Sequence, residues 1–235
     1  QIIWIPFFAA GVINGIGHYF GYRNYRTDDS SRNISRFAFF IMGEELHNNH
    51  HAFPSSCKFA HKKGEHDIGW YLIKGLNKLG LCEIKKVVPE LQLDESRVEF
   101  SDETVKAILT HKFNLMQLYI KDVINPNLNA EFSAPSKSLK KKINTYTKHL
   151  SLDPKFIKSK WKDKLQHNFE ENQTIQSMIA YKVELQAIWE NNSMSMEEMT
   201  EAFKAWCHKA EASGNKMLQE FAASLKQYKL SPAYT

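Results

Sequence analysis

Three imidazoles fall within five positions of one segment. His47, His50 and His51 lie in the run Gly-Glu-Glu-Leu-His-Asn-Asn-His-His that begins at residue 43. Residues three and four apart share one face of a helix, so these side chains are predicted to point to one place. Imidazole suits iron, zinc, copper and nickel, and three histidines also fit a zinc site with one open position. The spacing therefore predicts a metal site and leaves the metal open.

A second polar pair lies upstream, at the end of an apolar stretch. Asn14 and His18 are four residues apart and follow the run from Ile2 to Ile13, which only Pro6 and Gly11 interrupt. Polar side chains at the edge of a membrane span are costly and usually serve a functional site. The alternative is a histidine that ends a helix and meets interfacial water. Together with the downstream histidines, the pair favours a functional site.

The apolar runs set limits on how the chain meets a membrane. The stretch from Ile2 to Phe20 has about the minimum length for a span, so at most one span is expected. The run from Phe37 to Met42 is too short to cross and is expected to pack beside the metal site. The run from Ile68 to Leu81 contains Lys74 and Lys78, which favours an amphipathic helix lying in the interface.

Charge and cysteine content indicate the side and the compartment. Charged residues make up 24% of the chain, and its net charge is +5. Four arginines follow the first apolar run directly, and they predict that the histidines and all later residues are cytoplasmic: Arg23, Arg26, Arg32 and Arg36. The three cysteines are widely spaced and odd in number, which favours a reducing compartment without a disulfide or zinc framework.

From Pro89 onward the pattern is helical. Helices are expected at 102–124, ending at Asn125-Pro126, and at 154–191, 196–211 and 214–228. Ser195 and Glu198 have the spacing of a capping box. The apolar stripes on these helices predict core positions, with Lys112 the one lysine in the first stripe: Val105, Ile108, Leu109, Leu115, Met116, Tyr119, Ile179, Val183, Ile188, Trp189, Phe203, Trp206, Met217, Phe221 and Leu225. The expected fold class is all-α, with a first domain at 1–90 and a helical, lysine-rich region at 91–235.

Residues from about Asn14 to Val88 resemble the membrane-bound fatty acid desaturases of the delta-9 stearoyl/palmitoyl type, particularly their bacterial members. The shared motifs are Asn14 with His18, Gly21-Tyr22-Arg23, Gly43-Glu44-Glu45 before His47-Asn48-Asn49-His50-His51, and Asp67-Ile68-Gly69-Trp70. Two ligand-bearing segments in the right order make this a specific match. The resemblance implies the end of a transmembrane helical domain, with cytoplasmic metal-site helices and a helical cytoplasmic tail.

The resemblance also implies chemistry. Such enzymes hold two non-haem irons and use dioxygen and two electrons to place a cis double bond in a saturated acyl chain. The residues carried over as iron ligands are His18, His47, His50 and His51, with Asn14 acting through water. Glu44 and Glu45 are candidates to accept the other ring N–H of a ligating imidazole. Their alternative role is to cap and solubilise the helix. A related hydroxylase stays open, because the same iron chemistry can insert oxygen.

The implied partners are a fatty acyl substrate carried by CoA or by a lipid, membrane lipid, and an electron donor. The donor would be ferredoxin, or a cytochrome b5-like protein with its reductase, and the implied location is the bacterial inner membrane. The family carries two further histidine boxes upstream, His-x-x-x-x-His and His-x-x-His-His, but no histidine precedes His18 here. We therefore expect the C-terminal part of a longer desaturase, inactive alone.

The tail has a weaker resemblance. Residues 180–230 are similar to a helical segment near the C-terminus of insertion-sequence transposases, with no recognisable trio of catalytic acids, so only helical structure is carried over. Residues 135–165 hold ten lysines against two aspartates. Such a stretch can contact anionic lipid, nucleic-acid phosphate or an acidic electron donor, or it can simply be solvated.

The competing hypothesis is a lysine-rich helical binding module for membrane or nucleic acid that carries a remnant desaturase segment. Residues 101–235 contain no arginine. Because arginine is the main bidentate reader of guanine edges, sequence-specific DNA recognition is disfavoured, although phosphate contact is not. Nucleic acid is therefore not expected among the partners.

Overall fold

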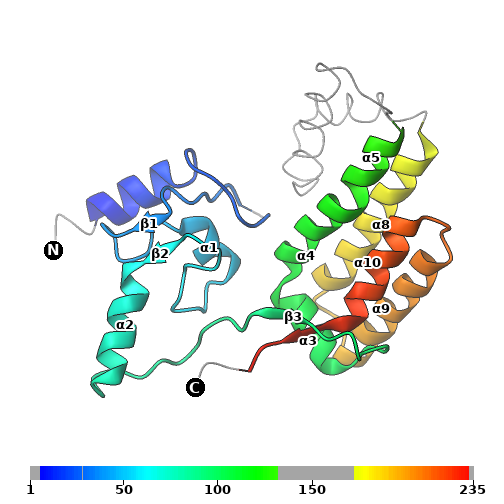
Figure 1. Ribbon diagram of the computed structural model, residues 1–235. Coiled ribbons are helices and arrows are strands. Elements are labelled where there is room, and N and C mark those ends of the chain that lie inside the picture. The colour runs from blue at the N-terminus through cyan, green and yellow to red at the C-terminus, as the bar shows by residue number, and fades with distance from the viewer. Residues whose placement is uncertain (1–5, 28, 132–171, 233–235) are drawn as a thin grey trace. The chain divides into compact units, whose positions relative to one another are not determined.

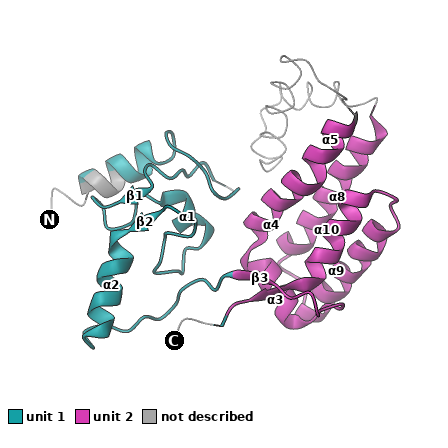
Figure 2. Ribbon diagram, in the orientation of Figure 1, with its two compact units in different colours: residues 1–90, 232–235 teal, residues 91–231 magenta. Residues whose placement is uncertain are grey.

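The computed structural model describes residues 6–27, 29–131 and 172–232 (Figure 1). The chain divides into two compact units, which are coloured separately in Figure 2. Unit 1 contains residues 1–90 and 232–235, and unit 2 contains residues 91–231. The lysine-rich stretch at 135–165 and the first part of the helix expected at 154–191 lie outside the described residues.

Unit 1 begins with a wide helix, η1 (Pro6–Ile16), followed by β1 (Phe37–Ala38), α1 (His47–Ala52), β2 (His66–Asp67) and α2 (Ile68–Lys78). The two strands pair in parallel, Phe37 with His66 and Ala38 with Asp67. Within the described parts of the chain, every helix is too short or too polar to cross a membrane. The span expected at Ile2 to Phe20 stays a prediction.

Buried amides and a carboxylate hold α1 in place. Asn49 of α1 accepts hydrogen bonds from the side chains of Asn24 and Asn33, both at 2.9 Å. Its own amide donates to the Glu65 carboxylate at 2.8 Å and to the Phe59 carbonyl at 2.7 Å. Buried polar groups are stable only when they are paired, so this network fixes the position of α1 closely.

Two glycines let the turn before α1 approach the start of α2. Gly43 has φ +107°, and a Cβ there would lie 2.5 Å from an Asp67 carboxylate oxygen. A Cβ on Gly69 would lie 2.0 Å from the carbonyl oxygen of Met42. Asp67 is the N-cap of α2 and accepts from the Trp70 N–H at 2.9 Å. The glycines therefore permit a contact that a larger residue would prevent.

Unit 2 is a helical bundle closed by a short sheet. Its elements are β3 (Leu91–Leu93), α3 (Asp102–Thr110), α4 (Lys112–Tyr119), η2 (Ile120–Ile124), α5 (Asn125–Glu131), α8 (Gln173–Glu190), α9 (Met196–Glu211), α10 (Lys216–Gln227) and β4 (Tyr228–Leu230). Figure 1 shows α4, η2 and α5 as one rod beside α8, α9 and α10. Strands β3 and β4 pair antiparallel, with Leu91 opposite Leu230.

The apolar stripes predicted on these helices form the core of unit 2. Most of the core positions named above are less than 9% exposed, and Phe203 and Leu225 are completely buried. Leu109, Ile179, Ile188 and Met217 are only partly buried. Val183 was predicted wrongly, because it is 47% exposed. The capping box is confirmed: Ser195 accepts from the Glu198 N–H, and the Glu198 carboxylate accepts from the Ser195 N–H. The helix expected at 196–211 has those bounds in the structure.

Two helix expectations were wrong in detail. The helix expected at 102–124 breaks at His111, where α3 ends and α4 begins, and Lys112 of the predicted stripe is half-exposed. Asn125-Pro126 does not end the rod. Pro126 lacks the backbone N–H that would continue the helical hydrogen bonds. The wider helix η2 precedes this proline. The Asn127 side chain donates to the Val123 carbonyl at 2.7 Å.

Two further expectations need correction: the all-α fold class, and the packing of the run from Phe37 to Met42. The structure is helix-rich, but it contains two short two-stranded sheets that an all-α class leaves out. The run from Phe37 to Met42 does not pack beside the histidines: Phe37 is 66% and Phe40 is 76% exposed. Pairing of β1 with β2 turns Ala38 inward, so the large side chains on either side of it face outward.

Candidate metal centre

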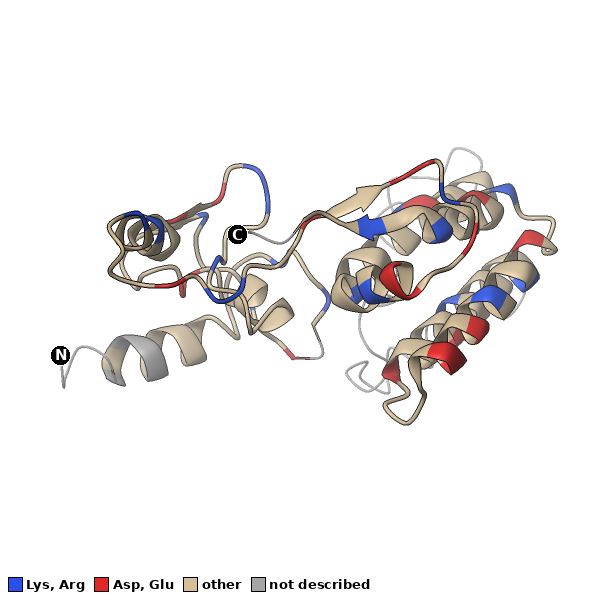
Figure 3. Ribbon diagram, turned by 90° about the horizontal axis from the view of Figure 1, so that it is seen from below, with Lys and Arg blue, Asp and Glu red and all other residues tan. Residues whose placement is uncertain are grey.

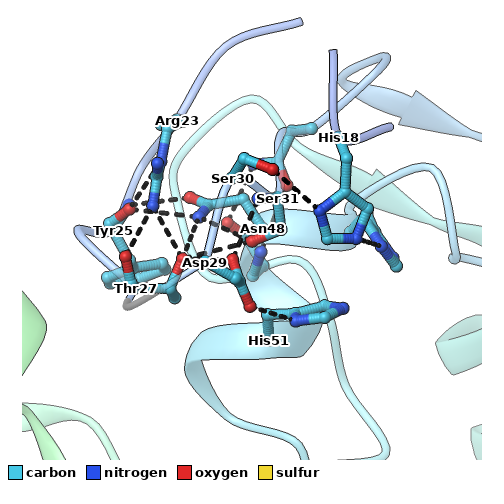
Figure 4. A network of polar contacts seen from close by, with 12 residues as sticks. His18, Arg23, Tyr25, Thr27, Asp29, Ser30, Ser31, Asn48 and His51 are labelled. Carbon is cyan, nitrogen blue, oxygen red and sulfur yellow. Dashed lines mark hydrogen bonds and ion pairs between the residues drawn. The ribbon is translucent and has the colours of Figure 1, made fainter. Parts of the chain in front are cut away.

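Three histidines from two segments converge in unit 1. The ligand atoms of His18, His47 and His51 lie within 4.8 Å of one another. Nε2 of His18 is 3.0 Å from Nε2 of His47, and the ring centres of His47 and His51 are 4.3 Å apart. Figure 4 shows His18 approaching α1 from the side of the helix that carries His51. We call these three residues the histidine cluster.

Helix geometry explains why His50 lies at the edge of the cluster. At roughly 100° per residue, His51 sits about 40° to one side of His47 and His50 about 60° to the other. His18 lies on the His51 side. The His50 ring packs edge-on against Phe59, with centres 4.8 Å apart, and its buried Nδ1 has no hydrogen-bond partner within the described residues. The structure thus groups three of the four predicted histidine ligands.

Asn14 and His18 do not share a helix face. Helix η1 ends at Ile16, and His18 lies in the turn that follows. Gly17 permits this turn because a Cβ there would lie 2.3 Å from the Ile13 carbonyl oxygen. The Asn14 side chain is exposed. Its proposed contact with a metal through water is therefore not built by helical spacing.

The electrostatics favour a neutral imidazole at His47. His47 is 3% exposed. Burial, together with the neighbouring rings of His51, His18 and His50, lowers the pKa of His47 to about 4. This imidazole is therefore uncharged at neutral pH, the form in which histidine binds metals.

Of the two predicted glutamates, Glu45 bonds elsewhere. Glu45 is 4% exposed, and its carboxylate accepts from the backbone N–H groups of Phe40 at 2.6 Å and Ile41 at 3.1 Å. Glu44 is half-buried. Across the described ranges, neither glutamate has a hydrogen bond to a histidine of the cluster. Glu45 therefore fixes the turn that leads into α1.

Asp29 and Ser30 are the residues that contact the imidazoles. Asp29 Oδ2 lies 2.5 Å from His51 Nδ1, and Ser30 Oγ lies 3.2 Å from His18 Nδ1. Burial alone would raise the pKa of Asp29, but hydrogen bonds from Ser31 and Thr27 and the nearby His51 hold it below its ordinary value. Sequence reasoning missed both residues. The available signal was an acid and a hydroxyl in a turn-forming run between two ligand segments.

A His-x-x-x-x-His spacing does occur at His61 and His66, downstream of the cluster. His66 is exposed and stacks on Phe37, with ring centres 5.0 Å apart. The His61 ring packs against Phe53 at 4.8 Å and against Tyr25 at 6.2 Å. Neither residue belongs to the cluster, so this spacing does not supply a second histidine box here.

The residues present fit a first-row transition metal. Two nitrogens that bind one ion at about 2.0–2.1 Å each lie roughly 3–3.5 Å apart, as the Nε2 atoms of His18 and His47 do. The buried Nδ1 atoms of His47 and His50 have no hydrogen-bond partner in the described structure. A donor set made of imidazole suits iron and zinc alike, so the geometry supports a metal without selecting one.

The first comparison concerns unit 2. A transposase family model, DDE_Tnp_ISL3, matches residues 105–231, more than half of the chain. The chain belongs to this transposase family. The match runs from Val105 in α3 to Ser231, just after β4. The transposase segment is therefore longer than the resemblance predicted at 180–230, because it also takes in α4, η2 and α5.

The same transposase-family chain is similar to delta-9 desaturases, which confirms the predicted resemblance. It is 40% identical to the delta-9 desaturase-like 4 protein of Arabidopsis thaliana over 90 residues, which are 38% of this chain and 30% of that protein. The delta-9 acyl-lipid desaturase 1 of Arabidopsis thaliana is 40% identical over 81 residues, 34% of this chain and 27% of the relative. The sn-1 stearoyl-lipid 9-desaturase of Anabaena variabilis is 35% identical over 92 residues, 39% and 34% of the two chains.

The chain thus spans about a third of the length of these desaturases. No solved structure matches it. The transposase family and the desaturase resemblance fall on different parts of the sequence, since the shared desaturase motifs lie between Asn14 and Val88 and the family match begins at Val105.

Proposed function

We propose that unit 1 is the metal-binding C-terminal part of a di-iron fatty acid desaturase. The observation that carries this proposal is the convergence of His18, His47 and His51 within 4.8 Å. It is supported by identity of 35–40% to delta-9 desaturases over about 90 residues. In this proposal His50 is a fourth histidine ligand from this chain, and Asn14 contacts the metal through water.

The chemistry follows from the group that these residues would hold. If these residues held iron, the metal would activate dioxygen for the removal of two hydrogens from adjacent methylenes of an acyl chain. The chain's own task is to present neutral imidazoles, as burial of His47 does, and to keep them rigid. Rigidity comes from the hydrogen bonds of Asn49 on α1 to Asn24, Asn33 and Glu65.

The substrate in this proposal is a saturated acyl chain carried by a lipid. Two of the relatives are named for acyl-lipid and stearoyl-lipid desaturation. A lipid-borne substrate requires that the protein works at a membrane, and the exposed Phe37, Phe39, Phe40 and Met42 supply apolar surface for that. Ferredoxin, or a cytochrome b5-like protein with its reductase, would deliver the electrons, and the location would be the cytoplasmic side of a bacterial inner membrane.

Turnover requires ligands beyond this sequence. The two further histidine boxes of the desaturases are not upstream of His18 in it. We therefore expect the chain to bind metal but to form a double bond only when those boxes are supplied.

The test is a hybrid enzyme. The part of the Anabaena variabilis desaturase that precedes its similarity to this chain is joined to the full chain and expressed in a host without delta-9 desaturase. We expect monounsaturated lipid, detected by gas chromatography, and its loss in His50→Ala. The exposed His208 in unit 2 provides the control variant, His208→Ala. A hybrid that is present in the membrane and forms no product, while the intact relative does, would contradict the proposal.

The same lipid extract separates desaturation from hydroxylation. A hydroxylated acyl chain in place of the olefin would assign unit 1 to the related di-iron hydroxylases. This outcome would keep the metal site and overturn the reaction.

The second candidate function belongs to unit 2, which carries the match to the transposase family. We propose a binding module that contacts nucleic acid through phosphate, because no arginine in residues 101–235 can read guanine edges. Low-salt retention of the full chain on duplex DNA of unrelated sequences, lost as salt rises, is the expected result. Failure of DNA to retain the chain at low salt would contradict it, and retention on anionic vesicles alone would favour membrane instead.

A further inference from the structure

We propose that Asp29 is a positioning residue of the metal site, which orients the His51 imidazole so that its Nε2 faces the cluster. Ser30 does the same for His18. This inference rests on the metal site of the proposed function, and it concerns how the site is built. It assigns the role that the sequence pattern gave to Glu44 and Glu45 to a different segment of unit 1.

The contacts place one nitrogen of each ring outside the cluster. Nδ1 of His51 meets Asp29 Oδ2, and Nδ1 of His18 meets Ser30 Oγ at 3.2 Å. Nε2 of His18 then points at Nε2 of His47, 3.0 Å away. Two of the three imidazoles thus have Nδ1 bonded to consecutive residues of one loop, which leaves Nε2 as the atom available to a metal.

The Asp29 carboxylate is itself held in position. Its Oδ1 accepts from the Ser31 N–H at 2.9 Å and from the Thr27 hydroxyl at 2.8 Å. Ser31 is completely buried and Thr27 is 6% exposed. One oxygen is therefore used to fix the side chain and the other meets His51 (Figure 4).

The loop is also fixed to the helix that carries the histidines. Asn48, next to His47 on α1, donates to the Tyr25 carbonyl at 3.0 Å and to the Thr27 hydroxyl at 3.3 Å. Arg23 donates to the Thr27 carbonyl at 2.9 Å. Asn48 is completely buried. These hydrogen bonds hold the loop against α1, and they therefore fix the distance from Asp29 to His51.

The contact with Asp29 favours one tautomer of His51, the form that carries its proton on Nδ1. Which ring nitrogen of a histidine carries the proton is set by the hydrogen bond that the other nitrogen makes. The Asp29 carboxylate accepts a hydrogen bond from an N–H at Nδ1 of His51, so Nε2 carries the free lone pair that a metal needs. Without Asp29, the ring loses this bias and is free to rotate.

The first experiment reads the tautomer without any metal. Imidazole nitrogen chemical shifts are measured in the metal-free full chain at alkaline pH, where ordinary imidazoles are neutral. We expect His51 to carry its proton on Nδ1, and to lose this preference in Asp29→Ala. Asp29→Asn keeps only one acceptor oxygen. Because the contacts with Ser31 and Thr27 hold that oxygen, its NH2 group should face Nδ1 of His51 and move the ring proton to Nε2. His51 with its proton on Nε2 in the unaltered chain, or shifts unchanged in Asp29→Ala, would overturn the inference.

The second experiment measures Co²⁺ affinity by the absorption of the bound ion. Loss of such an outer hydrogen bond typically weakens metal binding 10–100-fold, and we expect a loss of this size for Asp29→Ala and also for Asp29→Asn, whose NH2 group favours the proton on Nε2. Glu83→Gln, which changes an exposed acid of unit 1, is the matched control. Equal affinity in all variants would overturn the role of Asp29. If the unaltered chain binds no Co²⁺, the proposed function fails, and the tautomer measurement decides the present inference separately.

Discussion

Gly69 and Gly75 form a matched pair on α2 that tests how the metal helix is positioned. A Cβ on Gly69 would lie 2.0 Å from the Met42 carbonyl oxygen, whereas a Cβ on Gly75 would meet nothing within 4 Å. Real Cβ atoms essentially never lie within 3.0 Å of another heavy atom of this kind, so the Met42 carbonyl oxygen must move by about 1 Å away from the new Cβ. Met42 belongs to the turn that leads into α1, so Gly69→Ala should disturb the histidine cluster and Gly75→Ala should not.

The two substitutions are expected to change the free energy of unfolding in opposite directions. Overpacking against a backbone atom costs about 1–3 kcal/mol, and the gain in helix propensity offsets less than about 1 kcal/mol of it. Gly69→Ala should therefore destabilise unit 1 by about 1–2 kcal/mol. Gly75 is in the helix interior without a positive φ, so Gly75→Ala should stabilise α2 by about 0.5–1 kcal/mol.

Hydrogen exchange measured by mass spectrometry is the suitable assay, because it reports on α1 and α2 separately from unit 2. A change of one to two kcal/mol corresponds to roughly 5–30-fold in the opening equilibrium. We expect amides of α1 and α2 to exchange faster by this factor in Gly69→Ala, and amides of α2 to exchange more slowly in Gly75→Ala. Similar exchange in both variants would show that the turn and α2 do not pack as described.

Three further predictions concern unit 2. Ser195→Ala removes the N-cap of α9 and should lower the free energy of unfolding by about 1 kcal/mol in urea; an unchanged midpoint would contradict the capping box. Tyr119→Phe leaves the backbone carbonyl that accepts its hydroxyl at 2.7 Å without that donor, at a cost of about 1–3 kcal/mol by the same measurement; no loss would contradict the buried bond. Burial raises the pKa of Cys207 to about 12, so at pH 8 this thiol should react with a disulfide reagent far more slowly than Cys57 and Cys82, and equal rates would contradict its burial.

Local rules predicted the helices of unit 2 well because their signals lie close together in the sequence. The capping box at Ser195 needs only four consecutive residues, and it forms as expected. The apolar stripes need only helical spacing, and Phe203 and Phe221 are buried as predicted. The break at His111 was missed because the apolar spacing continues across it: Leu115, Met116 and Tyr119 beyond the break are buried as predicted.

The histidine cluster could be predicted only in part. His47 and His51 lie one turn apart, so helical spacing is enough to bring them together. His18 joins them through a turn after η1, and Asp29 and Ser30 come from a loop without periodicity. The short sheets were missed for a similar reason: β1 and β2 have two residues each and pair across nearly thirty residues of sequence. Contacts of this kind depend on tertiary structure that no local pattern encodes.

The most direct test of the metal site is X-ray absorption at the iron edge on the full chain loaded anaerobically with Fe²⁺, compared with His47→Ala. His208→Ala is the control, because this histidine is exposed and lies in unit 2. We predict bound iron with the multiple-scattering signature of several imidazoles in the unaltered chain and in His208→Ala, and loss of that signature in His47→Ala. Iron surrounded by oxygen ligands alone, or an imidazole signature that survives in His47→Ala, would contradict the account.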